Sequence, residues 1–215
     1  GRGTSAFGQG AFVLLPDLRL VLPHLAYRLG FANTLTGFKW VSRAPGLIFG
    51  YEEALGYLVN PQTIRDKDGI SAATALLDLA SSLAAEGRTI ADQLDAFAER
   101  FGFFASEQIS LRVSDVSRIG EIMAALRATP PSHLGAVPVS RIDDLSDGLG
   151  GLPPSDVLRI LLADGSRVMV RPSGTEPKLK IYIDASSDEG ALAERRSTAA
   201  ARVAALAEAM RALTA

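Results

Sequence analysis

A polar loop between two strand-like runs is the feature that most constrains the fold and the function of this chain. The runs cover residues 166–170 and 179–183, and the loop of residues 171–178 carries hydroxyls, a Gly at its bend and Arg171 at its mouth. Gly lets the backbone approach a ligand closely, so that successive N–H groups can converge on one anion. The guanidinium of Arg171 offers a planar fork that matches phosphate oxygens. The loop therefore predicts an oxyanion site, although a polar hairpin loop with a chance Arg explains its composition about equally well.

The overall composition sets broad limits on the class of protein. The chain has 215 residues, of which 47% are hydrophobic and 21% charged, as expected for one or two globular domains. A net charge of −2 gives no indication of a general nucleic-acid binder. The chain contains no Cys, which excludes disulfides and thiolate metal sites and is compatible with a cytoplasmic location. No apolar run reaches about 18 residues, so we expect no membrane span.

Residues 1–102 are expected to form an α/β domain. Short strand-like runs, such as those at 11–15 and 47–50, precede helical patterns. The clearest helical pattern has apolar residues at spacings of 3 and 4 between positions 70 and 84. Thr89 and Asp92 resemble a capping box that opens a second helix. Gly102 follows this helix and marks the expected domain boundary.

Residues 103–215 are expected to form a small α+β domain. Polar and apolar residues alternate over 107–113, which predicts a half-buried strand. The Asp-Gly pair at 164–165 predicts a hairpin between strands at 157–162 and 167–170. Apolar stripes predict helices at 116–126 and 192–213. The pattern indicates an antiparallel sheet with helices on one face.

Three loops of the first half carry residue types that can serve in a functional site. Thr36 and Gly37 form a turn, two Glu residues at 52–53 follow a strand directly, and Lys67 lies in a charged loop. Carboxylates can accept hydrogen bonds from sugar hydroxyls. Each loop alone also has a plain structural explanation: a common turn, acids near the positive end of a helix dipole, and Asp68 capping a helix.

Taken in order, these four loops resemble those of the α-D-phosphohexomutases, the phosphoglucomutase and phosphomannomutase enzymes. Residues 171–178 read Arg-Pro-Ser-Gly-Thr-Glu-Pro-Lys, like the phosphate-binding loop of that family. Residues 51–56 resemble its sugar-binding loop, with Ala54 where many members place Ser, and residues 65–69 resemble its Arg-Glu-Lys-Asp-Gly loop. The Thr-Gly pair at 36–37 is similar to a turn that recognises the sugar in two orientations. The resemblance implies the third and fourth domains of a four-domain enzyme.

The resemblance also implies a role for individual residues. The phosphate would be bound by Arg171, Ser173, Gly174 and Thr175. The sugar would be recognised by Thr36, Gly37 and Glu52. Lys67 would be the catalytic residue of this half, either as general acid–base or as a phosphate contact. The acid–base role would require a pKa lowered towards neutrality.

Two loops that such an enzyme needs for turnover do not occur in these 215 residues. Members of the family transfer a phosphoryl group from a phosphoserine to a phosphosugar, through glucose 1,6-bisphosphate in phosphoglucomutase, with Mg²⁺. Neither a Thr-Ala-Ser-His-Asn-Pro loop nor an Asp-x-Asp-x-Asp-Arg metal loop is present. The resemblance therefore implies a substrate-recognising C-terminal half that binds no metal itself and works with the N-terminal half of the same enzyme. Alone, it is expected to be inactive.

The residues leave the specificity open. Glucose phosphates are the leading expectation, and mannose or pentose phosphates are alternatives. A further alternative is a non-catalytic module that binds phosphosugars. The reading frame upstream of Gly1 would discriminate between an enzyme part and such a module, because only the former requires a Ser loop and a metal loop.

Overall fold

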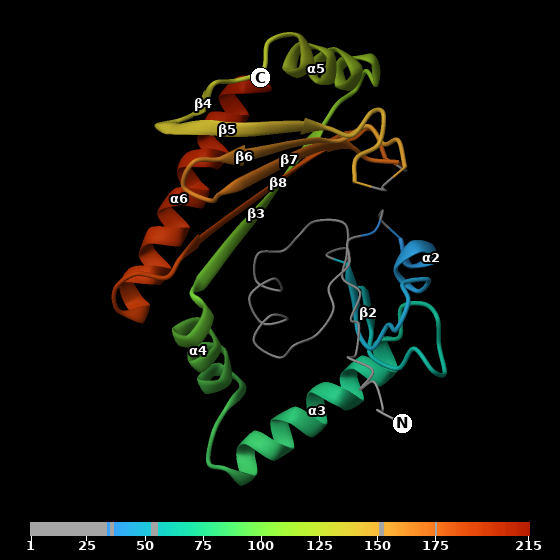
Figure 1. Ribbon diagram of the computed structural model, residues 1–215, viewed down its shortest axis with the longest axis vertical. Helices are drawn as coiled ribbons and strands as arrows, with labels where there is room; N and C mark the ends of the chain where they lie inside the picture. Colours follow the sequence, from blue (N-terminus) through green and yellow to red (C-terminus); the bar gives the residue numbers. More distant parts are fainter. Residues whose placement is uncertain (1–33, 35–36, 53–55, 151–152, 175) are drawn as a thin grey trace, which may run out of the picture. The chain divides into compact units, whose positions relative to one another are not determined.

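The computed structural model describes residue 34 and residues 37–52, 56–150, 153–174 and 176–215. The chain divides into two compact units, Gly1–Phe101 and Gly102–Ala215. Each unit is described by itself (Figure 1). The strand expected at 11–15 lies outside the described residues.

The first unit contains a two-stranded hairpin and three helices among its described residues. In chain order these are α2 (Phe38–Val41), β1 (Gly50–Glu52), β2 (Gly56–Leu58), α3 (Gly69–Ala85) and α4 (Ile90–Phe101). β1 and β2 pair in antiparallel fashion, with Glu52 directly opposite Gly56. A small apolar cluster, which includes Phe38, Val41 and Leu58, packs α2 against this hairpin.

Side-chain caps determine where the two longer helices begin. The carboxylate of Asp68 accepts hydrogen bonds from the backbone N–H groups of Ile70 and Ser71, each at 3.1 Å, and so caps α3. Before α4, the Thr89 hydroxyl accepts from the N–H of Asp92 at 3.1 Å, and the Asp92 carboxylate accepts from the N–H of Thr89 at 2.7 Å. These reciprocal bonds form a capping box, which confirms the prediction at Thr89 and Asp92.

The second unit is built on a six-stranded antiparallel sheet. Its strands are β3 (Phe103–Arg112), β4 (His133–Leu134), β5 (Val137–Asp144), β6 (Leu158–Leu162), β7 (Arg167–Pro172) and β8 (Lys178–Ser187). They are arranged in the order β3-β8-β7-β6-β5-β4. Two helices, α5 (Ser117–Ala128) and α6 (Leu192–Leu213), cover one face (Figure 1). The predicted α+β architecture with helices on one face is confirmed.

Alternation along the strands separates an apolar face from a polar face. In β8, Leu179, Ile181 and Ile183 are fully buried and pack in one core cluster with side chains of α5 and α6. Because successive side chains of a strand point to opposite faces, Lys180 and Tyr182 lie on the face away from the helices. The polar side chains of β8 therefore lie on the face of the sheet opposite the apolar core.

The predicted Asp-Gly hairpin joins β6 to β7. Gly165 has φ of +81°, a conformation that suits a residue without a side chain. The carboxylate of Asp164 accepts a hydrogen bond from the N–H of Ser166 at 3.0 Å, which stabilises the turn. The turn places β7 in the middle of the sheet, next to β8, and the loop 171–178 connects these two neighbouring strands.

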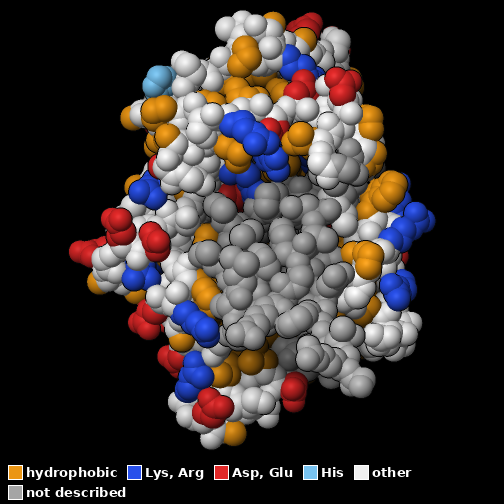
Figure 2. Space-filling view, in the orientation of Figure 1, with side chains coloured by type: hydrophobic (Ala, Val, Ile, Leu, Met, Phe, Trp, Pro, Cys, Tyr) orange, Lys and Arg blue, Asp and Glu red, His pale blue; other side chains and the backbone are white. Residues whose placement is uncertain are grey.

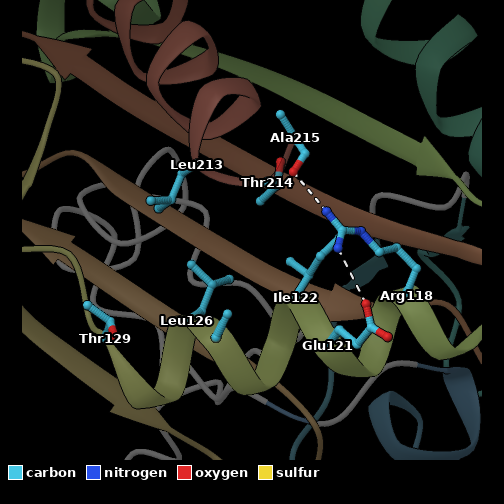
Figure 3. Close-up of a pocket in the computed structure, with 9 residues that line it drawn as sticks. Arg118, Glu121, Ile122, Leu126, Thr129, Leu213, Thr214 and Ala215 are labelled. Carbon is cyan, nitrogen blue, oxygen red and sulfur yellow. Dashed lines mark hydrogen bonds and ion pairs between the residues drawn. The ribbon is translucent and has the colours of Figure 1, made fainter.

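A hollow of about 410 Å³ lies between α5 and the end of α6 (Figure 3). Ile122, Leu126 and Leu213 supply apolar lining, and the guanidinium of Arg118 donates a hydrogen bond to the carbonyl of Ala215 at 2.9 Å. The hollow is on the helix side of the unit and includes none of the residues predicted for the site. None of the helices in the described part of the chain combines the length and hydropathy that crossing a bilayer requires.

Candidate functional site

The loop 171–178 closes the β7–β8 hairpin at one end of the six-stranded sheet. The N–H of Ser173 donates to the carbonyl of Lys178 at 2.9 Å, and the N–H of Lys178 donates to the carbonyl of Glu176 at 2.7 Å. The Lys178 ammonium lies 2.5 Å from the Glu176 carboxylate, and this hydrogen bond holds the pKa of Glu176 below its ordinary value. Gly174 lies at the bend, and Thr175 lies outside the described residues. Local backbone bonds and the ion pairs of Glu176 with Lys178 and, at 3.7 Å, with Arg112 therefore help to shape the loop.

Two cationic side chains stand next to each other where this loop begins. Arg171 and Lys180 are direct cross-strand partners on β7 and β8 and lie on the same face of the sheet. The buried ring of Tyr182 lies within reach of both, with its centre 5.7 Å from the Arg171 guanidinium carbon and 6.0 Å from the Lys180 ammonium. Arg171 also donates to the Tyr182 hydroxyl at 3.4 Å. The sheet thus presents two positive charges, oriented by one aromatic ring, beside the loop.

Sequence reasoning did not identify Lys180 or Tyr182 as members of this site. The signal that could have found them is the hairpin register, because the residue opposite Arg171 shares its face of the sheet. Like charges placed directly opposite each other destabilise a sheet pair. An anion bound between Arg171 and Lys180 would relieve that repulsion, which is the chemistry expected of a phosphate site.

Three arginines of the sheet, Arg141, Arg159 and Arg167, pair with carboxylates of neighbouring residues. The Asp143 carboxylate accepts from Arg141 at 2.5 Å and from Arg159 at 2.8 Å, and these contacts outweigh its burial and keep its pKa below the ordinary value. Arg167 pairs with Asp184, and both side chains are largely buried. Lys and Arg side chains gather on the viewed surface of this unit (Figure 2). The ion pairs compensate these charges, so we assign them a structural role.

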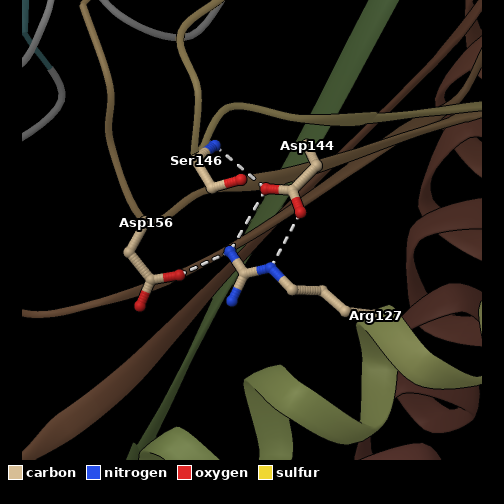
Figure 4. A network of polar contacts seen from close by, with 4 residues as sticks. All are labelled: Arg127, Asp144, Ser146 and Asp156. Atoms are coloured by element: carbon tan, nitrogen blue, oxygen red, sulfur yellow. Dashed lines mark hydrogen bonds and ion pairs between the residues drawn. The ribbon is translucent and has the colours of Figure 1, made fainter.

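Arg127 anchors the loop between β5 and β6 at both of its ends (Figure 4). Its guanidinium donates two hydrogen bonds to Asp144, at 2.8 and 3.2 Å, and one to Asp156 at 2.6 Å. Asp144 also accepts from the N–H of Ser146 at 3.0 Å. The hydrogen bonds from Arg127 hold the pKa of Asp144 below its ordinary value. Because β6 pairs with β7, this loop and the loop 171–178 leave the same end of the sheet.

Replacing Arg127 with Met is expected to make the free energy of unfolding depend less on pH in the acidic range. A lowered folded pKa of Asp144 adds stability above its unfolded pKa of about 4, and this stability is lost as pH falls through the folded pKa. We expect the variant to lose about 1 kcal/mol of unfolding free energy at pH 7, since the ion pairs are partly exposed. Urea unfolding at several pH values should show the difference from wild type shrinking below about pH 4.

The matched control for this prediction is Arg118→Met on the same helix. Arg118 makes two exposed contacts, an i,i+3 pair with Glu121 at 3.3 Å and a hydrogen bond to the carbonyl of Ala215 at 2.9 Å, so its loss should change stability less and with little pH dependence. Equal acid profiles for Arg127→Met and wild type would contradict the role given to Arg127.

In the first unit, three residues predicted from separate loops come together. The Glu52 carboxylate accepts a hydrogen bond from the N–H of Gly37 at 2.9 Å, and its other oxygen pairs with the ammonium of Lys67. That ammonium lies 5.7 Å from the centre of the Phe38 ring. Thr36, the fourth predicted member, lies outside the described residues. The turn, the Glu loop and the charged loop therefore meet at Glu52.

The exposure of this cluster is uneven. The Glu52 side chain is only 6% exposed, whereas the Lys67 side chain is 41% exposed. The Lys67 side chain is therefore the more accessible member of this ion pair. No group of three or more His, Asp or Glu side chains able to hold a metal ion occurs within the described ranges.

Comparisons with known proteins identify the family of the chain. The family model of the phosphoglucomutase/phosphomannomutase alpha/beta/alpha domain III matches residues 20–101, and that of the C-terminal domain matches residues 109–202. A "Probable phosphomannomutase" of Haemophilus influenzae is 48% identical over 177 residues, which cover 81% of this chain and 36% of that protein. The human "Phosphopentomutase" is 32% identical over 196 residues, covering 79% of this chain and 32% of that protein.

A solved structure shows the same fold. The crystal structure of the Paramecium phosphoprotein parafusin, a phosphoglucomutase in its open form, superposes with a TM-score of 0.65 at 20% identity, covering 94% of this chain and 38% of that one. The chain thus spans about a third of the length of the relatives it matches. With both domain models matched in order, the resemblance seen in the four loops is confirmed, and the chain belongs to the phosphoglucomutase/phosphomannomutase family, of which it carries domain III and the C-terminal domain.

Proposed function

We propose that this chain is the substrate-recognising part of a phosphoglucomutase-like enzyme that interconverts hexose 1-phosphate and hexose 6-phosphate. The observation that carries the proposal is the cross-strand pair of Arg171 and Lys180 beside the Ser-Gly-Thr loop. The positive charges of Arg171 and Lys180, both near the Tyr182 ring, favour binding of a phosphate dianion beside them. The relatives named above are mutases, which supports the same reading.

Each loop has a proposed task in binding the substrate. The phosphate that does not react would be bound by Arg171, Lys180, Ser173, Gly174 and Thr175. The sugar ring would be recognised by Thr36, Gly37 and Glu52. Lys67 would contact the reacting end, as a proton donor and acceptor or as a phosphate contact. Binding energy from the remote phosphate would then position the reacting end of the sugar.

The phosphoryl transfer itself belongs to the longer protein in this proposal. A phosphoserine would transfer its phosphoryl group to the sugar phosphate, which gives glucose 1,6-bisphosphate. The bisphosphate would then return its other phosphoryl group to the serine. The described residues do not fit a Mg²⁺ site, since no cluster of carboxylates or imidazoles among them could hold the ion. We propose that the metal and the nucleophile lie in an N-terminal half of the same cytoplasmic enzyme, as the family resemblance implies.

The identity of the sugar is a separate proposal. Relatives of this chain include proteins named phosphomannomutase, phosphoglucomutase and phosphopentomutase. We propose glucose phosphates as the leading substrates, because the Arg-Asp-Lys-Asp-Gly and Glu-Glu-Ala patterns resemble phosphoglucomutases or their phosphopentomutase-like relatives more than bacterial phosphomannomutases. The name of the 48% identical relative favours mannose phosphates instead. A non-catalytic phosphosugar-binding module is the alternative from a different class.

The 215-residue chain alone is expected to bind glucose 6-phosphate weakly and to catalyse no turnover. Its binding loops belong to two units, so ordering them should cost affinity. We expect a Kd in the millimolar rather than the micromolar range, a difference of about 4 kcal/mol. A titration followed by amide NMR should give shifts at residues 171–174, with smaller ones near Glu52, and a coupled mutase assay should give no signal.

The controls for this titration distinguish recognition of the phosphate group from recognition of the sugar ring. Unphosphorylated glucose should leave residues 171–174 unshifted, whereas mannose 6-phosphate and ribose 5-phosphate report on the two alternative specificities. Turnover by the purified chain, with contaminating mutase excluded, would contradict the proposal that the nucleophile and the metal lie in the N-terminal half. Absence of shifts in the loop with every phosphosugar would contradict the binding function.

A further inference from the structure

The lack of a side chain at Gly56 creates the space in which Glu52 and Lys67 meet. Gly56 lies directly opposite Glu52 in the β1–β2 hairpin. A Cβ atom at this position would lie 2.4 Å from Phe38 Cε2, 2.9 Å from Lys67 Cε and 3.0 Å from Glu52 Cγ. The aliphatic stem of Lys67 and the stem of Glu52 therefore both pass over Gly56, beside the Phe38 ring.

The constraint at Gly56 concerns space and not backbone conformation. Its φ angle lies outside the left-handed region, so an alanine could adopt this backbone. Its methyl group, however, would enter two contacts shorter than those that real Cβ atoms make, with Phe38 and Lys67, and a third tight contact with Glu52. Phe38 is buried and Glu52 is held by the Gly37 N–H, so neither can move away at little cost. Lys67 is the exposed and flexible member and is the one expected to be displaced.

We propose that Glu52 and Gly56 are positioning residues for Lys67: Gly56 leaves room for its stem, and the Glu52 carboxylate fixes its ammonium at the surface of the first unit. The Phe38 ring adds a cation–π contact on a third side. The inference deepens the proposed function, on which its consequence for catalysis rests, because Lys67 is the candidate for contact with the reacting end of the substrate.

This arrangement assigns Glu52 a task in addition to reading sugar hydroxyls. One carboxylate oxygen bonds the turn at Gly37, and the other bonds Lys67, so a single buried side chain links three loops. A charge-assisted contact of this kind is stronger and more directional than a contact between neutral groups. Lys67 is thereby presented as an oriented cation, suited to a phosphate oxygen.

The test observes the Lys67 ammonium itself, by ¹⁵N NMR of lysine side chains in the 215-residue chain. Lys67→Arg assigns the resonance by its loss. We expect an ammonium signal slowed in exchange by the ion pair, and its loss or broadening in Gly56→Ala and in Glu52→Gln. The matched control is Gly69→Ala, because a Cβ there meets no atom within 4 Å. Backbone amide spectra report separately whether each variant keeps its fold.

Glu52→Gln and a double variant test the proposal even if Gly56→Ala does not fold. Glu52→Gln retains an acceptor for the Gly37 N–H and nearly the same shape, so it tests the charge contact even if Gly56→Ala fails to fold. Gly56→Ala combined with Phe38→Leu removes the ring atom closest to the new methyl and should restore the Lys67 signal in part. An unchanged Lys67 signal in folded Gly56→Ala and Glu52→Gln would overturn the proposal.

A titration with glucose 6-phosphate separates this inference from the proposed function. If both hold, Gly56→Ala should remove the ligand-induced shift at Lys67 and leave the shifts at residues 171–174 of the other unit. If the proposed function fails, no variant and no wild type shows ligand shifts, although the Lys67 signal still responds to the substitutions. If the inference fails, ligand shifts at Lys67 persist in folded Gly56→Ala.

Discussion

Replacing Arg171 with alanine is expected to weaken phosphosugar binding roughly ten- to a hundredfold. The guanidinium stands at the mouth of the loop, is oriented by Tyr182 and lies opposite Lys180. Losing one charged hydrogen bond costs about 1.5–3 kcal/mol, which corresponds to that range of affinity. The effect should exceed that of any other single substitution in the second unit, and the NMR titration with glucose 6-phosphate measures it.

Two companion variants make this result interpretable. Lys180→Ala removes the second cation and should also weaken binding, though less, because an ammonium lacks the bidentate geometry of a guanidinium. Arg118→Ala removes an exposed Arg on the helix side and should leave affinity unchanged. In the longer enzyme, a KM for the phosphosugar unaffected by Arg171→Ala would contradict the assignment of the loop.

The architecture of the second unit could be predicted because its signals are local. Alternation in the strands, the Asp-Gly turn at 164–165 and the apolar stripe of α6 each depend on residues close in sequence. The same is true of the capping box at Thr89 and Asp92, whose partners are three residues apart. Such patterns are set by backbone periodicity and cap chemistry, which a single sequence contains.

The contacts inside the candidate site could not be predicted in the same way. Lys180 joins Arg171 through hairpin register, and Lys67 reaches Glu52 through the packing of loops 15 residues apart. The pattern of two Glu residues after a strand suggested a carboxylate open to hydroxyls, whereas the structure buries Glu52 against Gly37. The anchoring of the β5–β6 loop by Arg127 likewise has no local signal.

Replacing Asp184 with alanine is expected to destabilise the second unit by about 3–5 kcal/mol. Its carboxylate pairs with Arg167 across the β7–β8 register, and the two side chains are only 13% and 3% exposed. Without Asp184, the guanidinium of Arg167 loses its paired charge in a place where water cannot easily replace it. Denaturant unfolding of the variant, compared with wild type at pH 7, measures the loss.

The cost arises from an uncompensated buried charge, and this distinguishes it from simple loss of a contact. Removing both charges in Arg167→Met/Asp184→Leu should therefore recover most of the stability, since a buried ion pair can be replaced by apolar groups of similar size at little cost. Glu121→Ala, which breaks the exposed pair with Arg118, should cost at most about 1 kcal/mol. If the double variant is as unstable as Asp184→Ala, the packing around these side chains, and not the unpaired charge of Arg167, determines the stability of this face of the sheet.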